Sequence, residues 1–369
     1  MSESNKRNFI VHGSILAIAG ILVRIIGMLY RIPVVNIIGS EGNGIYGAAF
    51  NIYNIMLVLS SYGLPMAVSK LVSARFTKKR YKSAAKVLRC SLMVAVCTGG
   101  IAALLVFFGA SFIENVIYGG GLPGLAVPLR ILAPTIFLVA ILGVIRGFFQ
   151  GQSTMIPTAV SQILEQIVNA IVSIAAGYGM MKAFASLPDV AAYGAAGSTL
   201  GTAMGALTAV LFMGFLYAVY TPTFNRLKRK DRHTENQSTG QICKIIIYTM
   251  IPIILGQTFY QISALIDDVM FSNIMVGRDI TKSISMDLGN FSSSYSLLIG
   301  IPQGVASAMS ASMLPSVVAS FTDRDYDSIY DKITKTLKTN MFIAVPSFVG
   351  LFVICLLYTS PSPRDSTSS

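Results

Sequence analysis

The fold of this chain is decided by the stretch Arg24–Ser73, which reads RIIGMLYRIPVVNIIGSEGNGIYGAAFNIYNIMLVLSSYGLPMAVSKLVS. It contains two long apolar runs, with Arg24 in the first, Arg31 beside it and Glu41 in the link between them. A charge inside a membrane helix costs at least about 2.5–3.5 kcal/mol, so an arginine at this depth needs a structural or functional reason. The stretch therefore predicts a chain that is embedded in a membrane and lined for a polar ligand.

The composition of the whole chain agrees with this prediction. Of the 369 residues, 53% are hydrophobic and only 12% are charged, whereas a soluble domain carries about 25% charged residues. A membrane span needs about 20 predominantly apolar residues. The candidate spans lie over residues 10–31, 45–72, 88–112, 127–149, 156–180, 195–219, 243–271, 290–318 and 340–358. We therefore expect an all-α polytopic membrane protein, with about nine spans present.

The net charge of +12 is concentrated in loops between the candidate spans. One basic segment covers residues 75–89 and the other covers residues 226–232. Because cytoplasmic loops carry the excess of Lys and Arg, both segments are expected to be cytoplasmic, as is the N-terminus with Lys6 and Arg7. We therefore expect a multi-pass protein of the cell membrane rather than a nucleic-acid-binding protein.

Other chemical signals are weak. The four cysteines show no metal-ligand or redox spacing, and we interpret them as structural. The chain has no Walker motif and no catalytic constellation, so we expect neither an enzyme nor a consumer of ATP. The Ser/Pro-rich tail over residues 357–369 resembles a translated adaptor sequence, and we leave it out of the predicted fold.

An internal repeat divides the chain. The segments 74–83 and 319–328, ARFTKKRYKS and ASFTDRDYDS, share Ala, Phe, Thr, Tyr and Ser at a constant offset of 245 residues, and Gly44 and Gly289 share this offset. Chance similarity of two helix–loop junctions is the alternative to a true repeat. A true repeat would place six helices in each half, which is typical of transporters that alternate access between two lobes. We expect an N-terminal lobe over residues 1–225, a basic linker over 226–242, and a C-terminal lobe over 243–356 that is pseudo-symmetric to the first and truncated to three of its spans.

Two arginines mark the first span. Arg24 lies about 21 Å along this helix, past the middle of the membrane, and Arg31 lies two turns further. A cationic wall at this depth would bind an anionic group such as a phosphate or pyrophosphate. The alternative is snorkelling of the side chain toward the interface, which suits Arg31 better than Arg24.

The fifth candidate span carries a polar stripe. Ser161, Glu165, Asn169 and Ser173 follow one another at intervals of four residues and fall along one helix face. Glu165 lies close to the middle of the membrane, where an acid must be protonated, paired or hydrated. It would couple transport to protons or sodium, pair with an arginine of the first lobe, or pin two helices together.

Polar residues also occur in the seventh candidate span, at Gln257, Asp267 and Asp268. Adjacent residues of a helix point about 100° apart, so at most one of the two aspartates faces a cavity. We hypothesise that Asp267 or Asp268 forms a salt bridge with Arg24 or Arg31, which would close the two lobes on the outer side.

Several segments together resemble a known family. These are RIIGMLYRIP, IIGSEGNGIYG, YGLPMAVSKLVS, RGFFQGQSTMIPTAVSQILEQIVN and the Ile266–Asp268 region. They are similar to the stage V sporulation protein B-like polysaccharide biosynthesis proteins of Gram-positive bacteria, which resemble lipid II flippases and belong with polysaccharide and multidrug exporters. The likeness covers about residues 8 to 355.

The resemblance implies a two-lobed helical flippase for undecaprenyl-pyrophosphate-linked cell-wall precursors, with membrane lipids around it and cell-wall synthesis enzymes as further partners. Flippases of this class use cavity arginines against the pyrophosphate, and the matching positions are Arg24, Arg31 and, in the segment RGFFQGQ, Arg146. No cofactor is expected beyond coupling to a proton or sodium gradient. An ion-coupled drug antiporter, in which Glu165 and the aspartates would matter more, and a non-transporting scaffold of cell-wall or spore-cortex assembly are the alternatives. A membrane glycosyltransferase fits less well, because the sequence shows no soluble catalytic domain.

Overall fold

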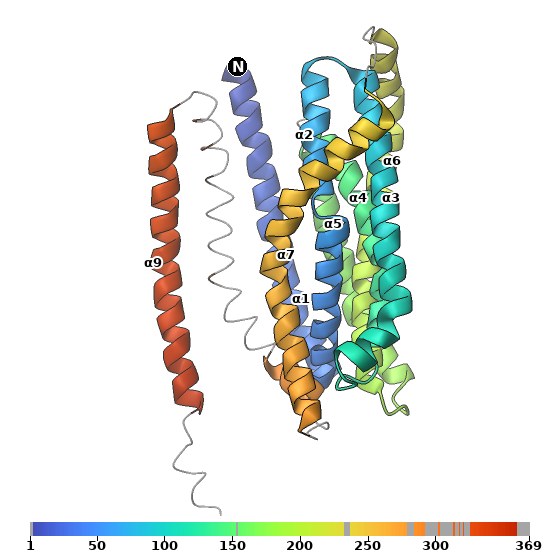
Figure 1. Cartoon of the computed structure of the whole chain (residues 1–369), viewed down its shortest axis with the longest axis vertical. Coiled ribbons are helices and arrows are strands. Elements are labelled where there is room, and N and C mark those ends of the chain that lie inside the picture. Colours follow the sequence, from blue (N-terminus) through green and yellow to red (C-terminus); the bar gives the residue numbers. More distant parts are fainter. Residues whose placement is uncertain are drawn as a thin grey trace, which may run out of the picture. The chain divides into compact units, whose positions relative to one another are not determined.

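A computed structural model of the chain is entirely helical in its regular secondary structure over the residues that it describes (Figure 1). The described residues are 3–152, 154–231, 237–278, 284–291 and 325–359, with the single positions 302, 313, 317 and 320. They fall into two compact units, Ile18–Ser292 and a unit made of Met1–Ala17 with Ser293–Ser369. Each unit is considered by itself, and the candidate site lies in Ile18–Ser292.

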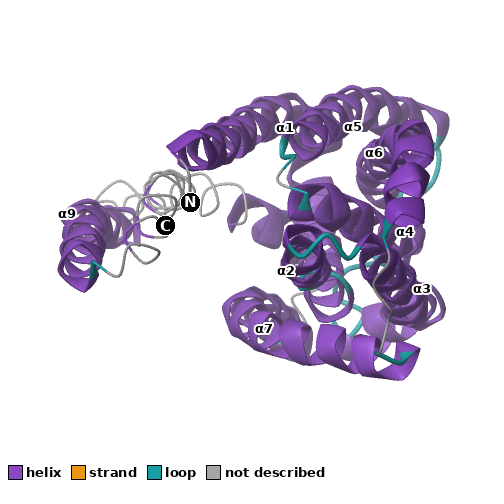
Figure 2. Cartoon of the chain, turned by 90° about the horizontal axis from the view of Figure 1, so that it is seen from above, coloured by secondary structure: helices purple, strands orange, loops and turns teal. Residues whose placement is uncertain are grey.

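Long helices make up both units. They are α1 (Glu3–Ser60), α2 (Leu64–Thr77), α3 (Tyr81–Phe112), the π-helical turn η1 (Ile113–Ile117), α4 (Ala126–Gly151), α5 (Ile156–Ala183), α6 (Val190–Lys230), α7 (Thr239–Gly277) and α9 (Tyr326–Thr359). A further short helix covers residues 284–291. Viewed along the helices, α5 lies between α1 and α6 (Figure 2).

The described helices have the length and composition of membrane spans. Seven stretches are long and apolar enough to cross a membrane, and one of them runs from Ala19 through α2 to Thr77. Large apolar side chains of α3 such as Leu105 and Phe108 point outward, with exposed fractions of 61% and 76%, which suits contact with lipid. The prediction of an all-α polytopic membrane fold is confirmed. The candidate span over residues 290–318 lies largely outside the described residues.

Helix α1 consists of two helices that meet at Gly39, where φ is 70° and ψ is 178°. This backbone conformation is accessible essentially only to glycine. The two predicted spans over 10–31 and 45–72 therefore lie on either side of a break that a glycine makes possible. The break directs the second segment of α1, residues 40–60, into the core of the unit.

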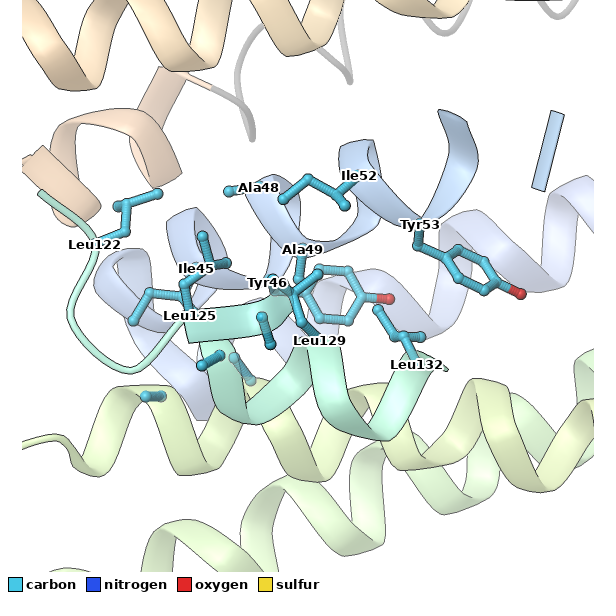
Figure 3. Packing of buried hydrophobic residues seen from close by; sticks show 14 of the residues in the cluster. Ile45, Tyr46, Ala48, Ala49, Ile52, Tyr53, Leu122, Leu125, Leu129 and Leu132 are labelled. Atoms are coloured by element: carbon cyan, nitrogen blue, oxygen red, sulfur yellow. The ribbon is translucent and has the colours of Figure 1, made fainter. Parts of the chain in front are cut away.

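The core of the Ile18–Ser292 unit has two large apolar clusters. The first joins the second segment of α1 to α4 and to the 118–125 loop (Figure 3), with Ile45, Tyr46, Leu125 and Leu129 among its members. The second joins α2, α3 and α4 to the first turns of α7. Because lipid tails are as apolar as these side chains, the tight fit of the helices contributes most of the stabilisation.

Helices α5 and α6 approach each other closely through glycines of α6. A Cβ on Gly205 would lie 2.6 Å from the carbonyl oxygen of Glu165, and one on Gly201 would lie 2.6 Å from that of Asn169. Small residues at such crossings let two backbones come into contact. The polar stripe of α5 is therefore held in place along its length by α6.

The two basic segments lie at the same end of the Ile18–Ser292 unit. Arg75 Nη2 donates to Gln237 Oε1 over 2.8 Å, and the backbone N–H of Lys82 donates to Asp231 Oδ2 over 2.8 Å. The end of α2, the start of α3, the end of α6 and the start of α7 all meet there (Figure 1). This region, residues 75–89 with 226–246, is called the basic end below.

Candidate functional site

The arginines of α1 share one face of their helix. Arg24 and Arg31 are seven residues apart, which brings them to within about 20° of each other around the helix axis. Arg24 is exposed and Arg31 is half-buried. Gly27 lies between them, and a Cβ at Gly27 would be 3.2 Å from Nε2 of Gln166 in α5. The arginine face of α1 therefore borders the polar stripe of α5.

The stripe itself ties three helices together. Asn169 Nδ2 donates to the Tyr30 hydroxyl of α1 over 3.2 Å. Ser173 Oγ bonds to Asn169 Oδ1 over 2.9 Å and to the carbonyl oxygen of Ser198 in α6 over 2.7 Å. Asn169 and Ser173 are buried, so these bonds satisfy polar groups that have no access to water. Asn169 thus fixes α1 beside α5.

Glu165 pairs with Arg146 of α4. Arg146 Nη2 lies 2.7 Å from Glu165 Oε2, and the two side chains are only 13% and 27% exposed. Arg146 Nε also donates to Ser161 Oγ over 2.9 Å. Of the alternatives for Glu165, the geometry therefore shows a partnership with an arginine of the N-terminal half. Arg146 is a neutralised cation here, whereas Arg24 and Arg31 form no ion pair among the described residues.

Two tyrosines of α1, which were not among the residues predicted from the sequence, complete this region. The Tyr46 phenol lies near Tyr30 and Arg31, and the Tyr53 phenol lies near Glu165. Both tyrosines are buried. The sequence signal that could have found them is their spacing of seven residues, because it puts both phenols on one face of a span that packs against other helices.

Asp268 of α7 makes a different contact from the one expected. Asn51 Nδ2 donates to Asp268 Oδ2 over 2.6 Å, and Asp268 is 6% exposed, whereas Asp267 is exposed. Among the described residues neither aspartate pairs with Arg24 or Arg31. The hypothesis of an arginine–aspartate bridge that closes the lobes is therefore wrong for this structure, because the amide of Asn51 takes the place of the arginine.

A fully buried phenol lies near Asp268, in the loop after η1. Tyr118 is 0% exposed, and its hydroxyl has no hydrogen-bond partner among the described residues. Burial, together with the nearby charge of Asp268, raises the pKa of Tyr118 above its usual range. Ser272 Oγ donates to the Tyr118 carbonyl oxygen over 2.8 Å, which fixes the loop to α7.

The predicted site residues therefore fall into two groups. Arg24, Arg31, Arg146, Glu165 and Asn169 gather around α1, α4 and α5, whereas Gln257, Asp267 and Asp268 lie on α7. Gln257 is half-buried and makes no hydrogen bond within the described part of the chain. In the same part of the chain, no three His, Cys, Asp or Glu side chains come together as metal ligands.

Comparisons with known proteins identify the family of the chain. The family model described as "Polysaccharide biosynthesis protein" matches residues 10–321. The chain is 27% identical to "Lipid II flippase MurJ" of Bacillus subtilis (strain 168) over 348 residues, which are 92% of this chain and 63% of that protein. It is 24% identical over 351 residues to "Stage V sporulation protein B" of the same organism, covering 94% of this chain and 65% of that protein. The chain thus spans less than two-thirds of the length of these relatives.

Solved structures show the same fold. An outward-facing multidrug resistance MATE family transporter of the MOP superfamily has a TM-score of 0.62 at 17% identity, with 95% of this chain and 75% of that chain covered. A MOP superfamily transporter from Pyrococcus furiosus has a TM-score of 0.61 at 17% identity, with 96% and 75% covered. The resemblance inferred from the sequence motifs is confirmed, and the chain belongs to the polysaccharide biosynthesis protein family of multi-pass membrane proteins.

Proposed function

We propose that this protein is a flippase that moves undecaprenyl-pyrophosphate-linked cell-wall or polysaccharide precursors across the cell membrane by alternating access. The observation that carries the proposal is the arginine face of α1 beside the polar stripe of α5. Arg24 and Arg31 supply two positive charges that no carboxylate of the described residues neutralises. The two arginines lie about two helical turns apart, which is about 10 Å along the helix axis. They can therefore bind an extended diphosphate or two successive anionic groups.

The relatives support the substrate class. One of them is named as a lipid II flippase and another as a sporulation protein, and the family is described by polysaccharide biosynthesis. In a site shielded from water, a cation attracts an anion far more strongly than at a surface. The amides and hydroxyls of α5 are suited to hydrogen-bond sugar groups next to such an anion.

The ion pair of Arg146 with Glu165 gives these two residues a separate role in the proposal. A substrate anion that approaches Arg146 would compete with the Glu165 carboxylate for this arginine. Glu165 and Asn169, together with Gln257, Asp267 and Asp268 of α7, are therefore the proposed positions for coupling to a proton or sodium gradient. Asp268 is the buried member of the α7 group.

The orientation follows from charge. Both basic segments lie at one end of the unit, and the positive-inside rule assigns that end to the cytoplasm. In the proposed topology the N-terminus is cytoplasmic, and the break at Gly39 lies near the outer face. Cell-wall synthesis enzymes would supply the substrate at the basic end.

An ion-coupled drug antiporter is the second candidate, favoured by the acid at membrane depth in α5. A cationic drug requires a free carboxylate, and Glu165 is occupied by Arg146 at 2.7 Å. The arginine face of α1 would moreover repel a cation. These two features favour the anionic substrate.

The test is rescue of a Bacillus strain depleted of its lipid II flippases by the full-length protein, in wild-type form and as Arg24→Ala. We expect rescue by the wild type and loss of rescue by the variant at equal membrane abundance. Arg130→Ala is the matched control, because Arg130 is an exposed arginine of α4 whose hydrogen bond within the described part of the chain goes to Ser111. Full rescue by Arg24→Ala would remove the pyrophosphate role, and failure of the wild type would argue against this substrate.

A further inference from the structure

The same short motif occurs at corresponding positions of the two halves. Ser40 and Gly44 lie four residues apart after the break in α1, and Ser285 and Gly289 lie four residues apart in the helix over 284–291. Each member of the first pair is related to one of the second by the repeat offset of 245 residues. Small residues at this spacing form a flat helix surface on which a second helix can cross closely.

In the structure these two motifs contact each other reciprocally. A Cβ at Gly44 would overlap the carbonyl oxygen of Ser285, and a Cβ at Gly289 would overlap the carbonyl oxygen of Ser40. The backbone nitrogens are equally close, at 3.0 Å from Gly289 N to the Cβ position of Gly44 and 2.9 Å from Gly44 N to that of Gly289. Contacts in which i meets j′ while j meets i′ are those of a two-fold interface. A local two-fold axis therefore passes between Gly44 and Gly289, and we call this contact the glycine crossing.

The glycine crossing is buried, and the side chain of Asn43 forms a hydrogen bond across it. Gly44 and Gly289 are both buried, and Asn43 Nδ2 donates to the carbonyl oxygen of Gly289 over 2.9 Å. The position related to Asn43 by the offset is Leu288, which belongs to the first apolar cluster instead. The contacts of the crossing among the described residues are made by backbone atoms and by the Asn43 amide.

The glycine crossing lies at the end of the unit opposite the basic end. Helix α7 starts at Thr239 beside the basic end and ends at Gly277, so its length of 39 residues carries the chain about 58 Å away. The 118–125 loop, which contacts the last turns of α7 through Tyr118 and Ser272, is at this far end as well. Residues 284–291 follow the end of α7 in the sequence, so the chain reaches them from this far end of the unit.

We propose that the glycine crossing is a reversible seal between the two lobes at the end away from the basic segments. This inference rests on the proposed alternating access and names the contact that must part when that end opens. A crossing of bare backbones can close fully only if both positions lack a Cβ, because packed surfaces tolerate little overlap. The Asn43 amide, which bonds across the crossing, gains water when the helices separate. One methyl group at either glycine would therefore shift the protein toward the state that is open at this end.

The position that reports on the seal is Ala48, a buried residue that lies four residues after Gly44 on the same side of α1 and about 6 Å deeper. We would place Ala48→Cys in a chain whose native cysteines are replaced by serine and measure its labelling in intact cells by a membrane-impermeant maleimide. Gly44→Ala and Gly289→Ala are each added to this background. Gly214→Ala is the control, because a Cβ at Gly214 in α6 meets nothing within 4 Å.

Both crossing variants are expected to raise the labelling rate of position 48 by about tenfold, which is the size of a modest population shift, and Gly214→Ala is expected to leave it unchanged. Two variants are used because one can be lost to misfolding, and the reciprocal contact predicts the same effect from either side. Unchanged labelling in a crossing variant that is inserted at normal abundance would overturn the proposal, as would an equal rise in the control. Labelling requires no transport of lipid, so its outcome is independent of whether the rescue test supports the proposed substrate.

Discussion

The two ends of the Ile18–Ser292 unit are held together by opposite kinds of contact. At the glycine crossing, two backbones touch where Gly44 and Gly289 meet, and a single amide, Asn43, adds a hydrogen bond. At the basic end, long charged side chains such as Arg75 reach across to the segment before α7, above an apolar cluster that contains Ile242 and Ile246.

This difference predicts a difference in tolerance. A contact between backbones has no side chain that can move away, so an added atom must separate the helices. Lys and Arg side chains at a surface adopt other rotamers at little cost, and single exposed ion pairs contribute about 0–1 kcal/mol. Substitutions at the glycine crossing should therefore destabilise the protein strongly, and substitutions at the basic end should destabilise it weakly.

The largest effect is expected for Gly289→Leu, which places four carbon atoms against the carbonyl oxygen of Ser40. Overpacking of this kind costs about 3 kcal/mol, and thermal unfolding of the purified protein in detergent would measure the loss. Gly109→Leu in α3 is the matched control, since a Cβ there meets nothing within 4 Å. Equal melting temperatures for both variants would remove the distinction between the two ends.

A smaller loss is expected for Asn51→Leu, near the glycine crossing. The substitution leaves Asp268 buried without its 2.6 Å donor, which costs about 2 kcal/mol. Asn54→Leu is the control, because Asn54 forms no hydrogen bond in the described part of the chain. Replacement of Asp268 by Asn in the Asn51→Leu background should recover part of the loss, and the same melting assay would show whether it does.

Much of this fold follows from the sequence, and the reason is that membrane spans are encoded locally. The apolar runs predicted the helices, and the interval of four residues put Glu165 and Asn169 on one face of α5, where the structure also has them. The offset of 245 residues linked Gly44 with Gly289 before any geometry was known.

The partners of polar groups did not follow from the sequence. One of the two aspartates, Asp267 or Asp268, was expected to meet an arginine, yet Asp268 accepts a hydrogen bond from Asn51, which is 217 residues away. Periodicity gives the face on which a side chain lies, but the neighbour on that face depends on how the helices are rotated and spaced. For the same reason, the direct contact of the two glycines could not be inferred from spacing alone.

At the basic end, Asp231→Ala should cost about 1 kcal/mol, the usual effect of a carboxylate that binds the first turn of a helix. Asp231 Oδ2 accepts the backbone N–H of Lys82 at the start of α3, over 2.8 Å. Asp189→Ala serves as the comparison, because Asp189 precedes α6 without a side-chain capping bond. A loss as large as that of Gly289→Leu would contradict the view that this end is the tolerant one.

The smallest effect is expected for Cys243→Ser, below about 0.5 kcal/mol, as for most substitutions outside a packed core. Cys243 of α7 is half-buried and lies within hydrogen-bonding reach of the buried Cys90 of α3, whose Sγ is 3.9 Å from the Thr239 carbonyl oxygen.

Both thiols, those of Cys90 and Cys243, are free, so an azodicarboxamide oxidant such as diamide should join them. The oxidant accepts two electrons and two protons from the pair and becomes the hydrazine as the disulfide forms.

That disulfide would show that α3 and the first turns of α7 pack against each other, as the second apolar cluster requires. Mass spectrometry of the digested protein should find the peptides of Cys90 and Cys243 linked after oxidation and separate after reduction. Cys97, which is exposed on the same helix, should remain unlinked to Cys243. A bridge requires the two Cα atoms to lie within about 7 Å. A product that joins Cys97 to Cys243 would therefore mean that α3 and α7 are rotated away from the packing described. It would also mean that the second apolar cluster is not the contact that closes this end.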